Sequence, residues 1–211
     1  MLERGSGNAS ESMARSEELR LIARAKGGSA DAYRSLVDAF KDRLFAFVWR
    51  MVRNHHEAED ICQSAFIKAY ESLKSYSENY AFSTWLFTIA YRLCLNAMRR
   101  KRAFSGETDF SLVAGESADT AITLASSEDA RRLRDRIWDA VDQLSPAQKS
   151  AVLLFYREGQ SCQEIGVVLG MPAVTVKSHL HRAREKLRDL LGSEVVEDWS
   201  AIREISDSRS A

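Results

Sequence analysis

The residues from 82 to 102 carry two kinds of side chain that bind different parts of a nucleic acid. The segment reads FSTWLFTIAYRLCLNAMRRKR, so an aromatic start leads to four consecutive cations. Aromatic rings can stack on unpaired bases, whereas Lys and Arg can bind phosphates. Phe82 and Phe87 suit the protein core, so stacking is expected of only some rings. The predicted surface for a single DNA strand comprises Tyr80, Trp85, Tyr91, Arg92, Asn96, Arg99, Arg100, Lys101 and Arg102.

A second set of cationic and hydroxyl residues follows a turn in EIGVVLGMPAVTVKSHLHRAREKL. Gly170 can end a short helix in a left-handed conformation, and a longer helix can begin at Ala173. This arrangement is a helix-turn-helix, whose second helix can contact phosphates and base edges of a duplex. The alternative is a helical hairpin with a merely solvated face. The expected contact residues are Thr175, Lys177, Ser178, His181, Arg182 and Arg184.

The elements that position these residues are expected to be helices throughout. Apolar residues recur at spacings of three and four, and the chain has only two prolines. One apolar stripe runs from Tyr33 to Met51, and a second helix follows a break at Asn54. Capping boxes at Ser145 and Ser161 predict two further helix starts. The fold class is therefore predicted to be all-α.

The composition divides the chain into five segments. Residues 103–125 contain four acids and neither Lys nor Arg, and their helical periodicity lapses, which indicates a flexible linker. The chain is thus predicted to consist of two small helical domains joined by a flexible acidic linker, the second domain being a helix-turn-helix domain. The segments are a flexible N-terminal segment at 1–14, the first domain at 15–102, the linker at 103–125, the second domain at 126–192 and a C-terminal tail at 193–211.

Composition and motif content exclude several other classes of protein. Thirty Lys and Arg residues balance thirty Asp and Glu residues, so any positive surface must be local. The spacing of Cys62, Cys94 and Cys162 favours reduced thiols in a cytosolic protein. No signal segment opens the chain, and no apolar run is long enough to span a membrane. Because no phosphate loop, nucleophile–base pair or paired catalytic carboxylates are recognisable, neither an enzyme nor a cofactor is expected.

Two pairs of histidines could be metal ligands by residue type. They are His55 with His56, and His179 with His181. Neighbouring residues and residues two apart do not share a helix face. No cysteine lies near either pair in the spacing of a tetrahedral site. No metal site is therefore expected.

Three segments resemble the extracytoplasmic-function (group IV) sigma factors of bacterial RNA polymerase, within the sigma-70 family. HHEAEDICQSAFIKAY resembles the family's D-x-E-D-[IV]-x-Q-[ED]-x-F-x-[KR]-[AV]-[WY] pattern. FSTWLFTIAYRLCLNAMRRKR resembles F-x-T-W-L-[FY]-x-I-A with its basic tail. EIGVVLGMPAVTVKSHLHRAREKL resembles E-I-A-x-x-L-G-x-P-x-G-T-V-K-S-R-L-x-R-A-R. These segments lie in both expected domains, in the order and spacing of the family.

The resemblance implies an alternative sigma factor that binds core RNA polymerase and directs promoter-specific transcription initiation. It implies that residues 15–102 are region 2, which binds core polymerase and recognises and melts the minus-ten element. It implies that residues 126–192 are region 4, which reads the duplex minus-thirty-five element. An anti-sigma factor as a further partner and a cytoplasmic location in a bacterium are also implied. The implied polymerase-binding residues are Glu57, Asp60, Gln63, Phe66 and Lys68.

Two alternative functions stay open at this point. One is a stand-alone helix-turn-helix transcriptional regulator that binds duplex DNA without polymerase. The other is a protein-binding module whose charged helices are only solvated. Whether promoter binding requires core polymerase distinguishes the stand-alone regulator from a sigma factor. A gel shift of promoter DNA with the holoenzyme tests the protein-binding module.

Overall fold

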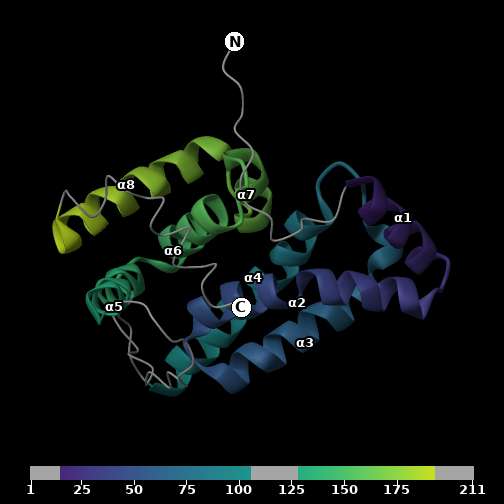
Figure 1. Cartoon of the computed structure of the whole chain (residues 1–211), viewed down its shortest axis with the longest axis horizontal. Coiled ribbons are helices and arrows are strands. Elements are labelled where there is room, and N and C mark those ends of the chain that lie inside the picture. The colour runs from purple at the N-terminus through teal and green to yellow at the C-terminus, as the bar shows by residue number, and fades with distance from the viewer. Residues whose placement is uncertain (1–14, 106–127, 193–211) are drawn as a thin grey trace, which may run out of the picture.

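A computed structural model describes residues 15–105 and 128–192 (Figure 1). Within these ranges the structure is helical and contains no strand, which confirms the all-α fold class. The helices form two groups, which we call the N-terminal group (α1–α4) and the C-terminal group (α5–α8). The predicted N-terminal segment 1–14, most of the linker 103–125 and the tail 193–211 lie outside the described residues.

The N-terminal group is built around a long central helix. Its elements are α1 (Arg15–Lys26), α2 (Ala30–Val52), α3 (His55–Glu71), the short 3₁₀ turn η1 (Leu73–Ser75) and α4 (Phe82–Ser105). Helix α2 packs against α1, α3 and α4 and buries the predicted stripe, including Leu36, Leu44 and Phe47. The predicted break at Asn54 is confirmed, because its side chain accepts a hydrogen bond from the Glu57 backbone N–H, 2.9 Å away, and so caps α3.

The C-terminal group contains the predicted helix-turn-helix. Its elements are α5 (Glu128–Asp142), α6 (Pro146–Val152), the π-helical turn η2 (Leu153–Arg157), α7 (Cys162–Leu169) and α8 (Ala173–Leu191). Both predicted capping boxes are formed, at Ser145 with Gln148 and at Ser161 with Glu164. Gly170 ends α7 with φ +69°, as the left-handed cap requires.

The helix-turn-helix also needs a second glycine that the sequence analysis did not single out. A Cβ at Gly166 would lie 2.7 Å from the backbone carbonyl oxygen of Met171. The absence of a side chain at this position therefore lets the turn approach α7.

One end of α4 differs from the prediction. The sequence placed the start of the linker at residue 103, but α4 continues to Ser105. Ala103 is a strong helix former, and the loss of charge beyond Arg102 does not by itself end a helix. The second domain was expected from residue 126, and α5 begins at Glu128.

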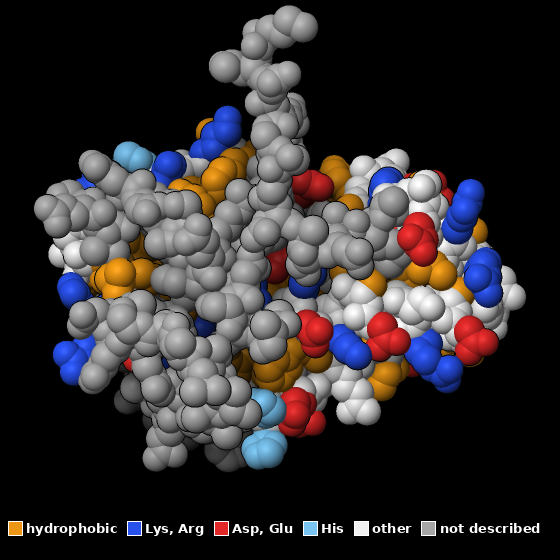
Figure 2. Space-filling model, in the orientation of Figure 1, with side chains coloured by type: hydrophobic (Ala, Val, Ile, Leu, Met, Phe, Trp, Pro, Cys, Tyr) orange, Lys and Arg blue, Asp and Glu red, His pale blue; other side chains and the backbone are white. Residues whose placement is uncertain are grey.

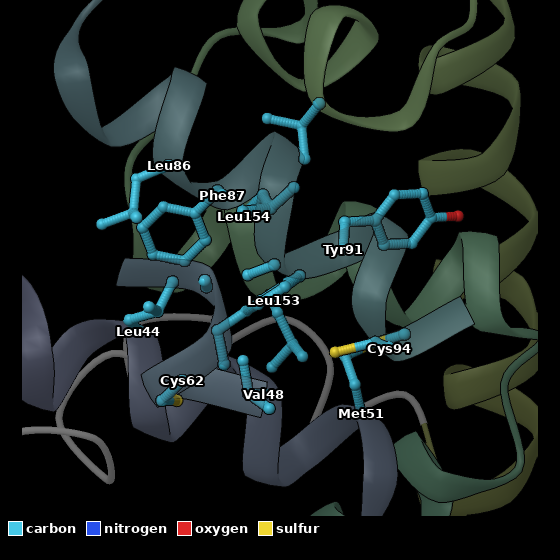
Figure 3. Close-up of a cluster of buried hydrophobic side chains, with 14 of the residues drawn as sticks. Leu44, Val48, Met51, Cys62, Leu86, Phe87, Tyr91, Cys94, Leu153 and Leu154 are labelled. Carbon is cyan, nitrogen blue, oxygen red and sulfur yellow. The ribbon is translucent and has the colours of Figure 1, made fainter. Parts of the chain in front are cut away.

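The two groups of helices pack against each other and share one apolar core. Helix α4 packs along α7, and α2 contacts α6. Leu153 and Leu154 of the C-terminal group lie among side chains of α2 and α4, including Val48 and Phe87 (Figure 3). The two groups of helices were predicted from the sequence, but their packing against each other was not.

The burial of the cysteines leads to a prediction about their reactivity. All three thiols are free, and Cys62 and Cys94 are buried whereas Cys162 is half-buried. Burial, reinforced by Glu59, raises the pKa of Cys62 to about 12, and burial also raises the pKa of Cys94. Because the thiolate is the reactive form, we expect iodoacetamide near neutral pH to modify Cys162 first. Peptide mass spectrometry would test this, and equal labelling of Cys62 in the folded chain would contradict it.

Candidate nucleic-acid and polymerase interface

The loop that leads into α4 is held by residues of α1. The Arg15 guanidinium donates to the backbone carbonyl oxygens of Glu78 and Tyr80, each at 3.3 Å. The Lys26 ammonium donates to the carbonyl oxygen of Tyr76 at 2.8 Å. Charge-assisted hydrogen bonds of this kind fix a backbone more firmly than neutral ones. The loop at 76–81 is thus anchored at both its ends.

A buried carboxylate from α1 caps the start of α4. Glu18 is 7% exposed, and its side chain accepts a hydrogen bond from the Phe82 backbone N–H at 3.2 Å. Glu18 also forms an ion pair with Arg15, so its charge is compensated. Carboxylates are favourable at helix N-termini because unpaired N–H groups point toward them. The roles of Arg15, Glu18 and Lys26 could not be predicted from the sequence, since their partners lie 50 to 65 residues away along the chain.

The aromatic residues at the start of α4 fall into two sets. Phe82 and Phe87 are fully buried, as the sequence predicted. Tyr80 is 43% exposed, and Trp85 is half-buried with its ring centroid 5.3 Å from that of Tyr76. Tyr80 and Trp85 are therefore the two proposed stacking residues that remain accessible.

Tyr91 is not accessible for stacking, contrary to the prediction. Its side chain is only 5% exposed, and burial raises the pKa of its hydroxyl, which lies beside Ser150 of α6. Its ring extends from α4 toward the ribbon of the C-terminal group (Figure 3). The sequence placed Tyr91 on an exposed face because the packing of α6 and α7 against α4 could not be foreseen.

The exposed polar residues of α4 form one stripe. Arg92, Asn96 and Arg99 are exposed, and with Trp85 they follow at steps of seven, four and three, which places them on the same side of a helix. Arg100 is exposed beside this stripe. The structure thus aligns one half-buried ring with a row of exposed polar side chains, two of which are cationic.

Lys101 and Arg102 are the last two of the four consecutive cations at the end of the segment. The Lys101 ammonium forms an ion pair with the Glu57 carboxylate of α3, with 2.7 Å between nitrogen and oxygen. Lys101 therefore ties α4 to α3 in this structure. The side chain of Arg102 lies outside the described residues.

The predicted polymerase-binding residues lie on α3. Asp60, Gln63 and Lys68 are exposed and Phe66 is half-buried, whereas Glu57 is engaged with Lys101. The first three are consequently available to a partner, and Glu57 has a structural role as well.

Helix α3 also exposes apolar side chains that the sequence analysis did not select. Ile67 and Tyr70 are both about half exposed, and the Tyr70 ring centroid lies 4.8 Å from that of Tyr33 on α2. Exposed apolar side chains next to polar ones are typical of protein interfaces. The period of three to four residues could have identified them, since they fall outside the buried stripe.

Residues assigned to different partners meet in one hollow between α3 and α4. The hollow has a volume of about 710 Å³. Its lining comprises Glu57, Asp60, Ile61, Ser64, Lys68, Leu93, Asn96, Arg99 and Arg100. Because carboxylate and guanidinium groups share this hollow, a partner that docks at Asp60 also approaches the cations of α4.

Helix α8 presents the predicted duplex-reading face to solvent. Val176, Leu180, Ala183 and Leu187 are buried, as the sequence predicted. The predicted contact residues Lys177, Ser178, His181, Arg182 and Arg184 are exposed, and Thr175 is half-buried. The Ser178 hydroxyl donates to the Val174 carbonyl oxygen at 3.1 Å, and His181 lies 3.4 Å from Glu185. The cations at 177 and 182 are therefore the more available contacts.

The surface as a whole carries mixed charge. Figure 2 shows Lys and Arg side chains interspersed with Asp and Glu side chains on the face in view, in keeping with the equal totals of the two kinds. The stripe on α4 and the outer face of α8 are accordingly local features. No helix among residues 15–105 and 128–192 is long and apolar enough to cross a membrane.

The first turn of α3 contains the one group of potential metal ligands found among the described residues. His55 and His56 lie 3.5 and 3.7 Å from the Glu59 carboxylate, although the sequence analysis placed the two histidines on different faces. All three residues are exposed, and each contact is that of an ordinary surface pair. This geometry alone does not support a metal site.

Two family models match the chain at the two groups of helices. Residues 36–104 match Sigma-70 region 2, and residues 134–187 match Sigma-70, region 4. The ECF RNA polymerase sigma factor SigW of Bacillus subtilis is 36% identical over 181 residues, covering 81% of this chain and 94% of SigW. The RNA polymerase sigma factor CarQ of Myxococcus xanthus is 34% identical over 169 residues, covering 80% of this chain and 94% of CarQ.

Two solved structures have a similar fold. CnrH, in complex with the cytosolic domain of CnrY, has a TM-score of 0.63 at 22% identity and covers 84% of this chain and 99% of its own. The sigma factor RpoE from Bartonella quintana, in complex with the anti-sigma factor NepR, has a TM-score of 0.64 at 24% identity. The match covers 77% of this chain and 98% of RpoE. Taken with the two region matches and the curated relatives, the helices and their order establish that this chain belongs to the extracytoplasmic-function sigma factors of the sigma-70 family, which are transcription initiation factors and not enzymes.

Proposed function

We propose that this sigma factor binds core RNA polymerase through α3 and reads its promoter at two separate places. A melted minus-ten strand lies on α4 and the loop before it, and a duplex minus-thirty-five element lies on α8. In this proposal residues 15–102 act as region 2, residues 126–192 act as region 4, and residues 103–125 link them. The supporting observation is the stripe of Trp85, Arg92, Asn96 and Arg99 next to an anchored loop.

The chemistry of the α4 surface supports single-strand binding over duplex binding. Tyr80 and Trp85 offer ring faces on which any unpaired base can stack. Arg92, Arg99 and Arg100 follow along the helix and suit the phosphates of the same strand. The anchoring of the loop by α1 reduces the entropy that is lost when a strand binds, because the backbone is already ordered.

A restraining partner and a location complete the proposal. CnrH and RpoE were solved with CnrY and with the anti-sigma factor NepR, respectively. We extend this to the present chain and propose that an anti-sigma factor of the same bacterium restrains it in the cytoplasm. The exposed apolar residues Ile67 and Tyr70 on α3 offer a surface for a protein partner.

Reconstitution with core polymerase tests the function directly. The chain is mixed with bacterial core polymerase and fragmented genomic DNA, and the 5′ ends of the transcripts are mapped. We expect defined start sites that are absent with core polymerase alone. If the chain instead retains promoter fragments without polymerase and produces no transcripts, the stand-alone regulator is the correct function.

Loss of two cations of α8 should weaken duplex binding. We expect Lys177→Ala and Arg182→Ala to reduce holoenzyme affinity for a promoter fragment. If the lost contact is to a phosphate, affinity should fall equally for all promoter sequences and should depend less steeply on salt. If it is to a base, the loss should be about 1–3 kcal/mol, with relaxed preference at one position of the promoter. A gel shift at several salt concentrations measures both effects.

Lys186 supplies the matched control for these variants. It lies on the same helix and carries the same charge, but its ammonium donates to the Gln143 carbonyl oxygen at the end of α5. Lys186→Ala should therefore leave promoter affinity close to that of the wild type. Equal losses for all three variants would show that only net charge matters, and unchanged affinity for Lys177→Ala and Arg182→Ala would mean that α8 does not face DNA.

A further inference from the structure

Helix α8 exposes an apolar side chain at its N-terminal end. Val174, the second residue of α8, is 69% exposed, more than any other large apolar side chain in the part of the chain that the structure describes. It does not belong to the described residues that form the apolar core or pack against it. Burial within the chain therefore does not explain a valine at this position.

The stability of the helix does not explain this valine either. A β-branched residue at an exposed helical position is less favourable than Ala, because its side chain loses rotamer freedom against the preceding turn. In the pattern E-I-A-x-x-L-G-x-P-x-G-T-V, which this segment resembles, the position of Val174 is Gly. The chain thus carries two methyl groups at a place where the pattern has no side chain.

Val174 begins a stripe on the outermost side of α8. The outward stripe, as we call it, is exposed along its length and follows at steps of four, three and four residues: Val174, Ser178, His181 and Glu185. At 3.6 residues per turn it lies opposite the buried side of the helix, which includes Val176 and Leu180. The Val174 side chain consequently points away from the C-terminal group.

Two cations border the outward stripe. Lys177 and Arg182 are exposed, and at 3.6 residues per turn they lie on either side of it. Helix α8 packs on α5, α6 and α7 and lies at the outer edge of the C-terminal group (Figure 1). In a helix-turn-helix the second helix enters the major groove, and its N-terminal residues contact base edges. Val174 is the residue of the outward stripe at that end.

The chemistry of Val174 limits what it can recognise in a major groove. Its side chain has no hydrogen-bond donor or acceptor, and the C5 methyl group of thymine is the apolar feature of the base edges there. The next two residues of the outward stripe are polar and engaged within α8. The Ser178 hydroxyl donates to the Val174 carbonyl oxygen at 3.1 Å, and His181 lies 3.4 Å from Glu185. Of the outward stripe, Val174 is the residue that suits a methyl group.

We propose that Val174 determines promoter specificity by contacting the C5 methyl group of a thymine in the major groove of the minus-thirty-five element. The inference rests on the proposed function of α8, and it goes further by naming one side chain and the chemical group that it reads. A chain with Gly at this position would lack the contact.

Replacement of thymine by uracil tests the contact, because it removes the methyl group and leaves the hydrogen-bonding edge of the base unchanged. The probe is a promoter fragment from a start site mapped with the wild-type holoenzyme. Each thymine in either strand of its minus-thirty-five element is replaced singly by uracil. We expect one replacement to lower the affinity of the wild-type holoenzyme about fourfold, which corresponds to the burial of one methyl group. A gel-shift titration measures the affinity.

Val174→Ala should abolish the response to uracil at that position. The variant lacks both methyl groups of the valine, and α8 should be retained because Ala is a strong helix former, which circular dichroism verifies. The variant holoenzyme should bind the thymine and uracil fragments equally. The wild type should therefore surpass the variant by a larger factor on thymine than on uracil, and this coupling between the two changes identifies a direct contact.

Leu190→Ala is the matched control. Leu190 is an exposed apolar residue of the same helix, 39% exposed at its C-terminal end. Its replacement also shortens an apolar side chain, but sixteen residues from Val174 along the helix. Leu190→Ala should keep the fourfold response of the wild type to uracil.

The possible failures of the inference and of the proposed function differ. If no uracil replacement lowers the affinity of the wild type, the thymine contact does not exist. If the loss persists in Val174→Ala, another side chain reads the methyl group. Either result overturns the inference and leaves the proposed function intact. If the wild-type holoenzyme binds no promoter and produces no transcripts, the proposed function is contradicted and the inference with it.

Discussion

Replacement of Asp60 by Arg should abolish the binding of this sigma factor to core polymerase. Asp60 is exposed on α3 and lines the hollow that also contains Arg99 and Arg100. An added guanidinium would face two others and would repel any cation of the polymerase that pairs with Asp60. Disruption of one member of an interfacial charge pair costs about 2–5 kcal/mol, or roughly 30- to 5,000-fold in affinity. Pull-down with tagged core polymerase measures the effect.

Glu71→Arg is the appropriate control for this experiment. Glu71 is an exposed acid at the C-terminal end of the same helix, so its reversal changes the net charge equally. A cation there is favourable for the helix dipole, and the fold should be retained. We expect wild-type pull-down for Glu71→Arg and unchanged helical content for both variants. Undiminished binding by Asp60→Arg would mean that polymerase docks elsewhere on α3, near Ile67 and Tyr70.

The local features of the fold could be predicted because they depend on residues close in sequence. The capping boxes at Ser145 and Ser161 and the left-handed cap at Gly170 each involve a few neighbouring positions. The buried stripes of α2 and α8 follow from the helical period alone. The three family motifs were sufficient to predict the order of the helices and the family of the chain.

The residues that the sequence could not place depend on contacts between distant helices. Helix α4 has apolar side chains on more than one side, so its pattern does not show which side faces α2 and which faces α7. Tyr91 was assigned to DNA for this reason, although it is buried. The capping of α4 by Glu18 and the pairing of Lys101 with Glu57 each join separate helices and have no signature in spacing.

The accessible aromatic residues should contribute to strand opening more than to the first promoter contact. We expect Tyr80→Ala and Trp85→Ala to reduce the formation of open complexes. A lost stack is worth about 1–3 kcal/mol per base, or roughly 5- to 150-fold. Permanganate footprinting of unpaired thymines measures opening, and a gel shift measures initial binding. Tyr80→Ala is the cleaner test. The hydrogen bonds that Tyr80 makes in the loop, among the described residues, are accepted by its backbone oxygen and survive the change, whereas Trp85 also packs on Tyr76.

A template with a pre-melted minus-ten bubble separates the roles of rings and cations. If Tyr80 and Trp85 stabilise bases that have left the duplex, a bubble supplies those bases without the cost of unpairing and should largely rescue the aromatic variants. Arg99→Ala and Arg100→Ala lose phosphate contacts that a bubble also requires, so they should stay defective and show a weaker dependence on salt. If the bubble rescues neither class, Tyr80 and Trp85 only support the fold, and the strand is held by the cations of α4 alone.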